Sequence, residues 1–444
     1  MQSYNNIKFF SIPSPSYVLE KDKLESNLAT LSDIQEKSGA KVLLALKGYA
    51  FWRRFQEVGK ILSGSTASGI HEARLGFEEI GGRESGKEVC VFSPAYKPSE
   101  INALLPIATH IIFNSFAQWQ RYKSAIDSKN KQLETLGLSP ISVGLRVNPL
   151  YSEVSPAIYN PCAPKSRLGI IPSEFQKGVE SYGLEGISGL HFHTHCEQDS
   201  AALQRTLAHV EKHFGAYIPQ MQCINFGGGH HITRADYDRG LLVSLIREFK
   251  AKHHDIEVFL EPGEAVGWQC GFLVGEVVDI VENDGQIAIL DVSASAHMPD
   301  CLEMPYRPSV FKVSRQISDE ASDGKIEITE ADKGDPREPD SDISDIKASQ
   351  SAHENPNQNP PKTCGKYHYR LGGPTCLAGD IIGDFSFDTP LNVGDRVVFE
   401  DMLHYTIVKN TTFNGVPLPS LGVVENGRFV MLKEFGYQDY KERN

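Results

Sequence analysis

Residues suited to covalent and ionic chemistry stand at the ends of strand-like runs in the first 262 positions of this 444-residue chain. They are Lys47 in KVLLALK, Arg146 in VGLRVNP, His193 in GLHFHTH, a triple glycine in INFGGGHH and Glu261 in VFLEPGE. A parallel barrel brings the C-terminal ends of all its strands to one mouth, so such residues converge despite their distance in sequence. The pattern predicts an enzyme with a single active site.

Lys47 offers a primary amine, which forms a Schiff base with an aldehyde. Burial among apolar neighbours would lower its pKa and favour the reactive neutral amine. The alternative is a lysine at a strand end whose stem packs on apolar surface while its ammonium group reaches water. Lys47 alone favours that structural role, and the accompanying residues reverse the preference.

Gly227, Gly228 and Gly229 follow a strand-like run, where glycine lets backbone N–H groups wrap an anionic phosphate. A plain turn is the alternative, because glycine tolerates positive φ. Three consecutive glycines at this place are a more specific signal than a pair would be.

Glu261 and His193 fit the ring of a flat, nitrogen-containing cofactor. The Glu261 carboxylate can pair with a protonated pyridine nitrogen and strengthen an electron sink. The His193 ring can stack on an aromatic ring. The structural alternatives are a salt bridge at the barrel rim for Glu261 and a buried core position for His193.

The run HFHTH places His191, His193 and His195 at alternate positions, and an HH pair follows at His230 and His231. Alternate residues of a strand share one face, as metal ligands require. No H-E-x-x-H motif or carboxylate triad accompanies them. We therefore expect no metal site, and a metal-dependent barrel hydrolase is kept as an alternative.

Strand-like and helix-like runs alternate through the same region. The eight candidate strands cover residues 41–46, 64–68, 88–93, 109–113, 141–147, 187–193, 222–226 and 256–261. This alternation predicts parallel βαβ units and an α/β fold with a (β/α)8 TIM barrel over residues 25–270. A doubly wound open sheet is disfavoured, because its phosphate loop normally follows the first strand.

The pattern changes to β-rich beyond residue 270, so residues 271–444 are predicted to form a second, C-terminal β-rich domain. Residues 1–24 contain the strand-like PSPSYVLEKD and are predicted to add a strand to that domain. Residues 316–365 are rich in Asp, Glu, Ser, Pro and Asn with almost no aromatic residue. We predict a disordered acidic insertion there, in a surface loop.

Composition argues against several classes of protein. The formal net charge of −13 disfavours nucleic acid as a partner, although residues 316–365, with 12 acidic and five basic side chains, carry over half of it. The eight cysteines form no C-x-x-C pair, which argues against a zinc ribbon or a disulfide framework. We see no secretory signal and no membrane-spanning run, so a soluble cytoplasmic protein is expected.

Longer motifs narrow the prediction. They are K-x-Y-A (47–50), TASG (66–69), HFHTHCEQD (191–199), NFGGGHH (225–231), LEPGEAV (260–266), SASAHMPDCLEMPYRP (293–308), RLGGPTCLAGD (370–380) and FEDMLHYTIVKNTTFNGVPLPS (399–420). Together they closely resemble the pyridoxal-phosphate-dependent decarboxylases of the alanine-racemase fold, over most of residues 10–440. GPTC and FNG are shared with ornithine and diaminopimelate decarboxylases, whereas HTHCEQD, SASAHMPD and EMPYRP favour the carboxynorspermidine decarboxylase branch.

This resemblance implies a decarboxylase whose cofactor is pyridoxal 5'-phosphate. Lys47 would carry the cofactor as an imine and later help to protonate the product. His193 would stack on its ring, Glu261 would pair with its nitrogen, and the three glycines with Tyr405 in MLHYT would bind its phosphate. Cys376 in GGPTC would reach in from a partner subunit as general acid at the α-carbon. The family therefore implies a homodimer with shared active sites.

Ornithine decarboxylases usually carry arginine at the position of Glu264 in EPGE. An acidic residue there suits a cationic substrate with additional ammonium groups, and Asp300 in AHMPD is the natural second anion. We predict that Glu264 and Asp300 bind the amines of a carboxylated polyamine, with ordinary ion pairing as the alternative. The predicted reaction converts carboxynorspermidine and carboxyspermidine to norspermidine and spermidine in polyamine biosynthesis.

Three related functions remain as alternatives. A diaminopimelate or ornithine-type amino acid decarboxylase shares the cofactor. A racemase on the same fold needs a second base on the opposite face, which we do not identify in the sequence. A non-catalytic pyridoxal-phosphate-binding protein resembles the barrel alone, so the GPTC and HYT segments count against it.

Overall fold

The computed structural model describes residues 4, 6–155, 157–303, 306–315, 326–332 and 365–444. They form two compact units, which are called the barrel domain (Glu25–Val266) and the β-domain (Met1–Leu24 with Gly267–Asn444). None of the helices in the described residues is long and apolar enough to cross a lipid bilayer.

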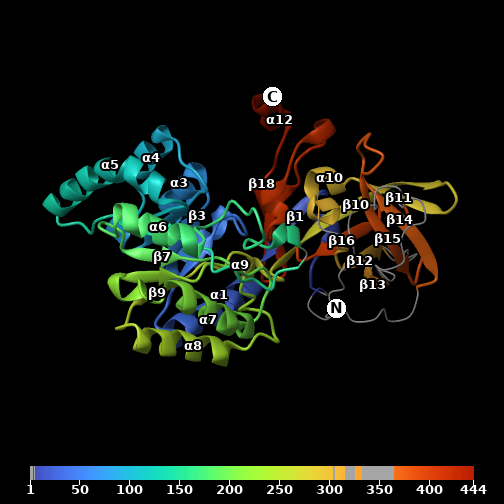
Figure 1. Ribbon diagram of the computed structural model, residues 1–444. Helices are drawn as coiled ribbons and strands as arrows, with labels where there is room; N and C mark the ends of the chain where they lie inside the picture. The colour runs from blue at the N-terminus through green and yellow to red at the C-terminus, as the bar shows by residue number, and fades with distance from the viewer. Residues whose placement is uncertain (1–3, 5, 156, 304–305, 316–325, 333–364) are drawn as a thin grey trace. The chain divides into compact units, whose positions relative to one another are not determined.

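Eight parallel strands close into a barrel, and helices surround it (Figure 1). The strands are β2 (Lys41–Ala45), β3 (Gly64–Ala67), β4 (Glu88–Phe92), β5 (His110–Phe113), β6 (Ser142–Arg146), β7 (Gly189–His191), β8 (Cys223–Asn225) and β9 (Glu257–Leu260). Each strand pairs with the next along the chain, and β2 closes the ring by pairing with β9 at Val42↔Leu260. The predicted TIM barrel is confirmed.

The helices bury one face against the strands. They are α1 (Lys21–Ser38), α2 (Phe55–Ile61), α3 (Ile70–Glu79), α4 (Pro98–Leu104), α5 (Phe116–Thr135), α6 (Pro172–Tyr182), α7 (Ser200–Phe214), α8 (Arg239–Lys252) and α9 (Glu264–Gly267). In α5 the buried residues Trp119, Tyr122 and Ile126 recur at spacings of three and four, the period of one helix face. Ser115 caps the start of this helix, because its hydroxyl accepts a hydrogen bond from the Gln118 N–H at 3.2 Å.

Two glycines leave room for neighbouring side chains in the barrel interior. A Cβ atom at Gly144 in β6 would lie 2.6 Å from Ile112 Cδ1, and one at Gly189 in β7 would lie 2.6 Å from Cys223 Sγ. Ile112 and Cys223 pack there with other buried apolar residues, including Phe259. The strands therefore hold a packed interior, so the open end of the barrel is where chemistry can occur.

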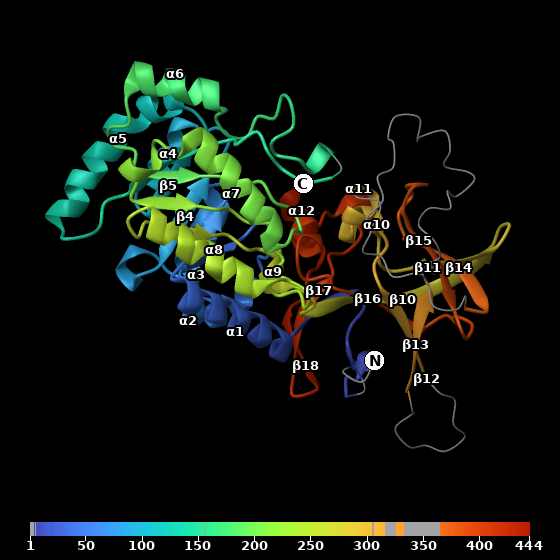
Figure 2. The same cartoon turned by 60° about the horizontal axis from the view of Figure 1, so that its bottom comes forward.

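The β-domain contains one ten-stranded sheet (Figure 2). Its strands, in spatial order, are β11 (Gln286–Leu290), β14 (Tyr367–Gly372), β15 (Ile381–Phe387), β13 (Ile326–Asp332), β12 (Val310–Arg315), β16 (Arg396–Glu400), β10 (Gly271–Glu282), β1 (Ser16–Glu20), β17 (Ser420–Glu425) and β18 (Arg428–Lys433). The long strand β10 also pairs with β11, which joins seven of the strands into a ring. This second, β-rich domain was predicted.

The N-terminal strand β1 lies in this sheet, antiparallel to β10 and parallel to β17. Within the acidic segment 316–365, for which we predicted disorder, residues 326–332 form β13 and pair with β12 and β15. The alternating sequence of this strand suits a sheet with one buried face, which composition averaged over the segment conceals. Residues 316–325 and 333–364 of the segment lie outside the described residues.

Candidate active site

The chemistry-bearing residues of the barrel domain follow the C-terminal ends of its strands. Lys47 follows β2, His193 follows β7, the glycines 227–229 follow β8, and Glu261 directly follows β9. Because all eight strands run in parallel, these residues share one mouth, as the sequence predicted.

Lys47 combines access to solvent with crowded surroundings. Water reaches its side chain, and partial desolvation of the amine lowers its pKa. The Arg146 guanidinium lowers the pKa further, whereas the Glu261 carboxylate opposes the shift. A lowered pKa raises the fraction of neutral amine, which is the nucleophilic form.

Glu261 is a buried carboxylate that stays ionised. Burial alone would raise its pKa, but interactions with His191, Asn225 and Thr66 outweigh it and lower the pKa to about 2. The Asn225 side-chain Nδ2 donates to Glu261 Oε1 at 2.7 Å, and His191 Nε2 lies 3.3 Å from Oε2. The mouth of the barrel therefore holds a fixed negative charge.

His193 is held as a neutral, half-buried ring. Its Nδ1 accepts a hydrogen bond from the Gly228 N–H at 2.9 Å, which selects the tautomer protonated on Nε2. Burial lowers its pKa well below the usual range, and the cations Lys47 and Arg146 lower it further. A flat, uncharged ring of this kind can pack against a planar ligand.

The glycine turn has a conformation and a closeness of approach that require glycine. Gly227 and Gly229 have φ values of +72° and +82°. A Cβ atom at Gly228 would lie 2.2 Å from the Glu261 carbonyl oxygen. The Gly227 N–H donates to Asn225 Oδ1 at 2.8 Å and the Gly228 N–H donates to His193, so both brace site side chains.

Arg146, which the sequence analysis placed at the barrel mouth without a specific role, and Asn225, which it did not single out, are further site residues. The Arg146 guanidinium lies over the Phe92 ring, 4.4 Å from its centroid, and donates to the His193 carbonyl at 3.3 Å. Phe92 in turn stacks on His191, with ring centroids 5.6 Å apart. Burial lowers the pKa of Arg146 to about 10, so the cation persists at neutral pH. The sequence signal that could have identified both roles is a polar side chain at the end of a strand.

The three histidines of HFHTH have different polar partners. Strand β7 ends at His191, so the alternation of a strand stops before His193. His191 interacts with Glu261, His193 accepts from Gly228, and His195 Nδ1 contacts Gln198 Oε1 at 3.0 Å. Each of the three histidines therefore has its own partner.

A second charged group lies in the loops of the barrel domain. Glu264, the first residue of α9, has its Oε2 3.1 Å from Nε2 of the buried His231. One ligand atom each from Glu197, His231 and Glu264 lie within 4.8 Å of one another, the one such group of three or more among the described residues. Two carboxylates with one imidazole can bind an ammonium group or a metal ion.

The remaining predicted residues belong to the β-domain. Cys376 is exposed in the loop 373–380 between β14 and β15, and its N–H donates to Asn414 Oδ1 at 2.6 Å. Tyr405 has φ +42°, a strained value for a side chain of this size. Asp300 is buried, and its Oδ1 lies 2.5 Å from Lys409 Nζ, so the charge of Asp300 is paired in this structure.

Comparisons with known proteins identify relatives along almost the whole chain. Residues 342–402 match the model of the pyridoxal-dependent decarboxylase C-terminal sheet domain. A carboxynorspermidine/carboxyspermidine decarboxylase of Campylobacter jejuni is 43% identical over 98% of this chain and 99% of that protein. A carboxyaminopropylagmatine decarboxylase of Synechocystis is 41% identical over 99% and 97%.

Solved structures agree with these relatives. The crystal structure of carboxynorspermidine decarboxylase from Campylobacter jejuni, complexed with norspermidine, is similar with a TM-score of 0.76 at 41% identity. The similarity covers 98% of this chain and 100% of that one, so both domains are included.

Proposed function

Because the chain belongs to the carboxynorspermidine/carboxyspermidine decarboxylase family of pyridoxal-dependent decarboxylases, we propose that it decarboxylates carboxynorspermidine and carboxyspermidine to norspermidine and spermidine. The observation that carries the proposal is the pairing, in one barrel mouth, of the Lys47 amine with its lowered pKa and the ionised carboxylate of Glu261. These two groups suit the two ends of a pyridoxal ring system, the aldehyde and the ring nitrogen.

The cofactor of this proposal is pyridoxal 5'-phosphate, and the residues fit it. When bound, this group accepts the electron pair that remains on the α-carbon as CO₂ leaves. Lys47, as a neutral amine, would hold the cofactor aldehyde covalently. Glu261 would keep a proton on the ring nitrogen, because its lowered pKa maintains the negative charge opposite that nitrogen. His193 would cover one face of the ring.

We assign the phosphate to the glycine turn and Tyr405. The N–H groups of Gly227 and Gly228 already donate hydrogen bonds to protein side chains. A phosphate at this turn would therefore be bound by the peptide N–H groups from Gly229 onward. A hydroxyl such as that of Tyr405 can complete the contact.

Cys376 is the proposed proton donor to the α-carbon, supplied by a second subunit of a homodimer. Its exposure at a loop tip supports this role, because the thiol is accessible on the domain that carries it. A residue supplied in this way would make each active site depend on dimer formation.

Substrate recognition is assigned to the acidic side chains. Glu264 would bind an ammonium group of the polyamine, and the nearby Glu197 adds a second negative charge. Asp300 would serve the same purpose together with Glu303, because both carboxylates lie within ion-pair distance of Lys409 and belong to one acidic segment.

The proposed substrate range includes closely related compounds. Carboxynorspermidine and carboxyspermidine differ by one methylene, worth only about 1–3 kcal/mol in a pocket, so we propose that both are accepted. The Synechocystis relative is named for carboxyaminopropylagmatine, which makes that compound the second candidate substrate.

The deciding experiment has two parts. An absorption spectrum before and after borohydride reduction, with the modified peptide mapped, tests the covalent link at Lys47. CO₂ release is then compared among carboxynorspermidine, carboxyspermidine, carboxyaminopropylagmatine, diaminopimelate and ornithine. We expect a reducible visible band and release from the first two compounds. A band without CO₂ from any compound would indicate a non-catalytic cofactor-binding protein.

A further inference from the structure

Asp380 is a buried carboxylate at the base of the loop that carries Cys376. The loop 373–380 joins β14 to β15 (Figure 2). Its ends are tied by hydrogen bonds from the Gly373 N–H to the Asp380 carbonyl, at 2.8 Å, and from the Asp380 N–H to the Leu377 carbonyl, at 2.9 Å. Asp380 is 2% exposed, so its carboxylate must be satisfied inside the protein.

Within the loop, Thr375 satisfies one oxygen of this carboxylate. The Thr375 hydroxyl donates to Asp380 Oδ2 at 2.7 Å, and the Thr375 N–H lies 3.3 Å from the same oxygen. A Cβ atom at Gly373 would lie 2.3 Å from Oδ2, so glycine is needed there for the carboxylate to approach. Cys376 is the next residue after Thr375, and the position of its backbone is therefore set by Asp380 on one side and Asn414 on the other.

The same carboxylate also anchors a second segment. Ser293 Oγ donates to Asp380, at 2.9 Å from Oδ1 and 3.0 Å from Oδ2, and the Ser295 N–H donates to Oδ1 at 3.1 Å. These serines begin the helix α10 (Ala294–His297), which precedes α11 (Asp300–Glu303). One buried side chain thus joins the Cys376 loop to the segment that leads to Asp300.

We propose that Asp380 is a positioning residue, which holds the Cys376 thiol in the geometry that proton transfer requires by fixing its loop against the segment that begins α10. The inference rests on the role proposed above for Cys376. Asp380 acts through Thr375 rather than on the substrate. Misplacing a reacting group by about 1 Å can cost on the order of 100-fold in rate, so the loss of this anchor affects turnover.

The test is a double-mutant cycle in the full-length, cofactor-loaded enzyme. Asp380→Asn keeps the size of the side chain but replaces an acceptor oxygen by a donor, and kcat is expected to fall by roughly 10- to 100-fold. The visible absorbance of the cofactor remains unchanged. Adding Asp380→Asn to Cys376→Ala produces no further loss, because the anchored thiol is already absent. The control is Asp384→Asn in β15, where a partly exposed ion pair with Arg370 is lost.

Multiplicative losses in the double variant, or wild-type kcat in Asp380→Asn, would overturn the inference. Wild-type kcat in Cys376→Ala would instead refute the proposed proton donor itself, so the two failures are distinguishable. If Asp380→Asn does not fold, Thr375→Val replaces it in the cycle. Thr375→Val is then expected to lower kcat, while Thr375→Ser, which retains the hydroxyl, restores it. Equal rates in these two variants would also contradict the inference.

Discussion

Asn225 joins the glycine turn to the buried carboxylate of the barrel mouth: its Nδ2 donates to Glu261 Oε1 at 2.7 Å, while its Oδ1 accepts from the Gly227 N–H at 2.8 Å. Two features that we assign to opposite ends of the cofactor are therefore braced by one side chain. A change at this residue should disturb both ends together.

Asn225→Ala removes a hydrogen bond to a charged group, worth about 1.5–3 kcal/mol, and leaves the Gly227 N–H without this acceptor. We expect cofactor affinity to fall by roughly 10- to 100-fold, measured by absorbance titration of the cofactor-free enzyme. Asn225→Asp retains the acceptor for Gly227 but places a second negative charge beside Glu261. It should therefore bind cofactor more weakly than the alanine variant, and the reverse order would contradict the bracing role.

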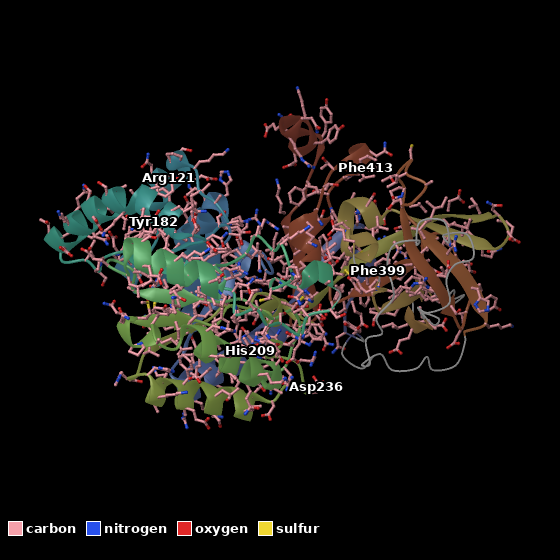
Figure 3. The ribbon with its side chains drawn as sticks, in the orientation of Figure 1. Arg121, Tyr182, His209, Asp236, Phe399 and Phe413 are labelled. Carbon is pink, nitrogen blue, oxygen red and sulfur yellow. The ribbon has the colours of Figure 1, made fainter. Side chains whose placement is uncertain are left out.

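Arg146 lowers the pKa of Lys47, so its removal should be visible in the pH dependence of that amine. Arg146→Met keeps a long apolar stem while removing the positive charge, which raises the Lys47 pKa. The Arg146→Met variant, freed of cofactor, should then need a higher pH to form its visible band with pyridoxal phosphate at a given rate. Arg121→Met, on the exposed face of α5 (Figure 3), is the control and should leave this pH profile unchanged. An unshifted profile in Arg146→Met would refute the electrostatic role.

Much of the barrel was predictable because short strand-like runs alternate with helix-like runs along the first 262 residues. The contacts between side chains of different strands were not predictable, since they depend on strand register. Asn225 meets Glu261 because β8 pairs with β9 in a register that sets Asn225 beside Phe259. In the β-domain, Asp300 and Lys409 are 109 residues apart. Sequence patterns report local periodicity, and such long-range pairs leave no periodic signal.

The acidic residues beside His231 make a prediction about substrate affinity. Glu264→Gln removes one negative charge and should raise KM for carboxynorspermidine by about tenfold, with cofactor absorbance unchanged. Glu197→Gln should have an effect in the same direction. The control is Glu174→Gln, which removes an exposed charge from α6. Unchanged KM in both variants would remove these residues from substrate recognition.

Chelation separates an ammonium site from a metal site at the same residues. If Glu197, His231 and Glu264 bind the substrate, incubation with EDTA followed by its removal should leave kcat and KM unchanged. A loss of activity that a divalent cation restores would show instead that this group holds a metal ion.

His110 should make the stability of the barrel domain depend on pH. Burial alone would lower its pKa, but interactions with the Cys223 thiol and the Glu88 carboxylate raise it to about 9. Because the folded-state pKa exceeds the unfolded value of about 6.5, this stabilisation is complete below pH ~6.5 and is lost as pH rises to about 9. Between pH 6 and pH 9, Tm should fall less in His110→Gln than in the wild type. His71→Gln, exposed on α3, should retain the wild-type slope.

Asn414 offers a way to separate backbone strain from the support of Cys376. It lies in the 3-10 helix η8 (Phe413–Gly415), beside the exposed Phe413 (Figure 3), and has φ +60°. Asparagine tolerates this left-handed conformation, and its Oδ1 is at the same time the acceptor for the Cys376 N–H. The residue therefore has a conformational role and a hydrogen-bonding role.

Asn414→Gly keeps the favourable backbone and removes only the acceptor, whereas Asn414→Ala adds a strain of about 1–2 kcal/mol. We expect both variants to lose a similar factor in kcat, about 5- to 50-fold, while only the alanine variant also loses several degrees in Tm. The matched control is Asn426, which has φ +51° in the turn between β17 and β18. Asn426→Ala should lower Tm by a comparable amount with kcat unchanged. If kcat in the Asn414 variants followed Tm, and glycine restored both, strain alone would explain Asn414 and its support of the Cys376 loop would be refuted.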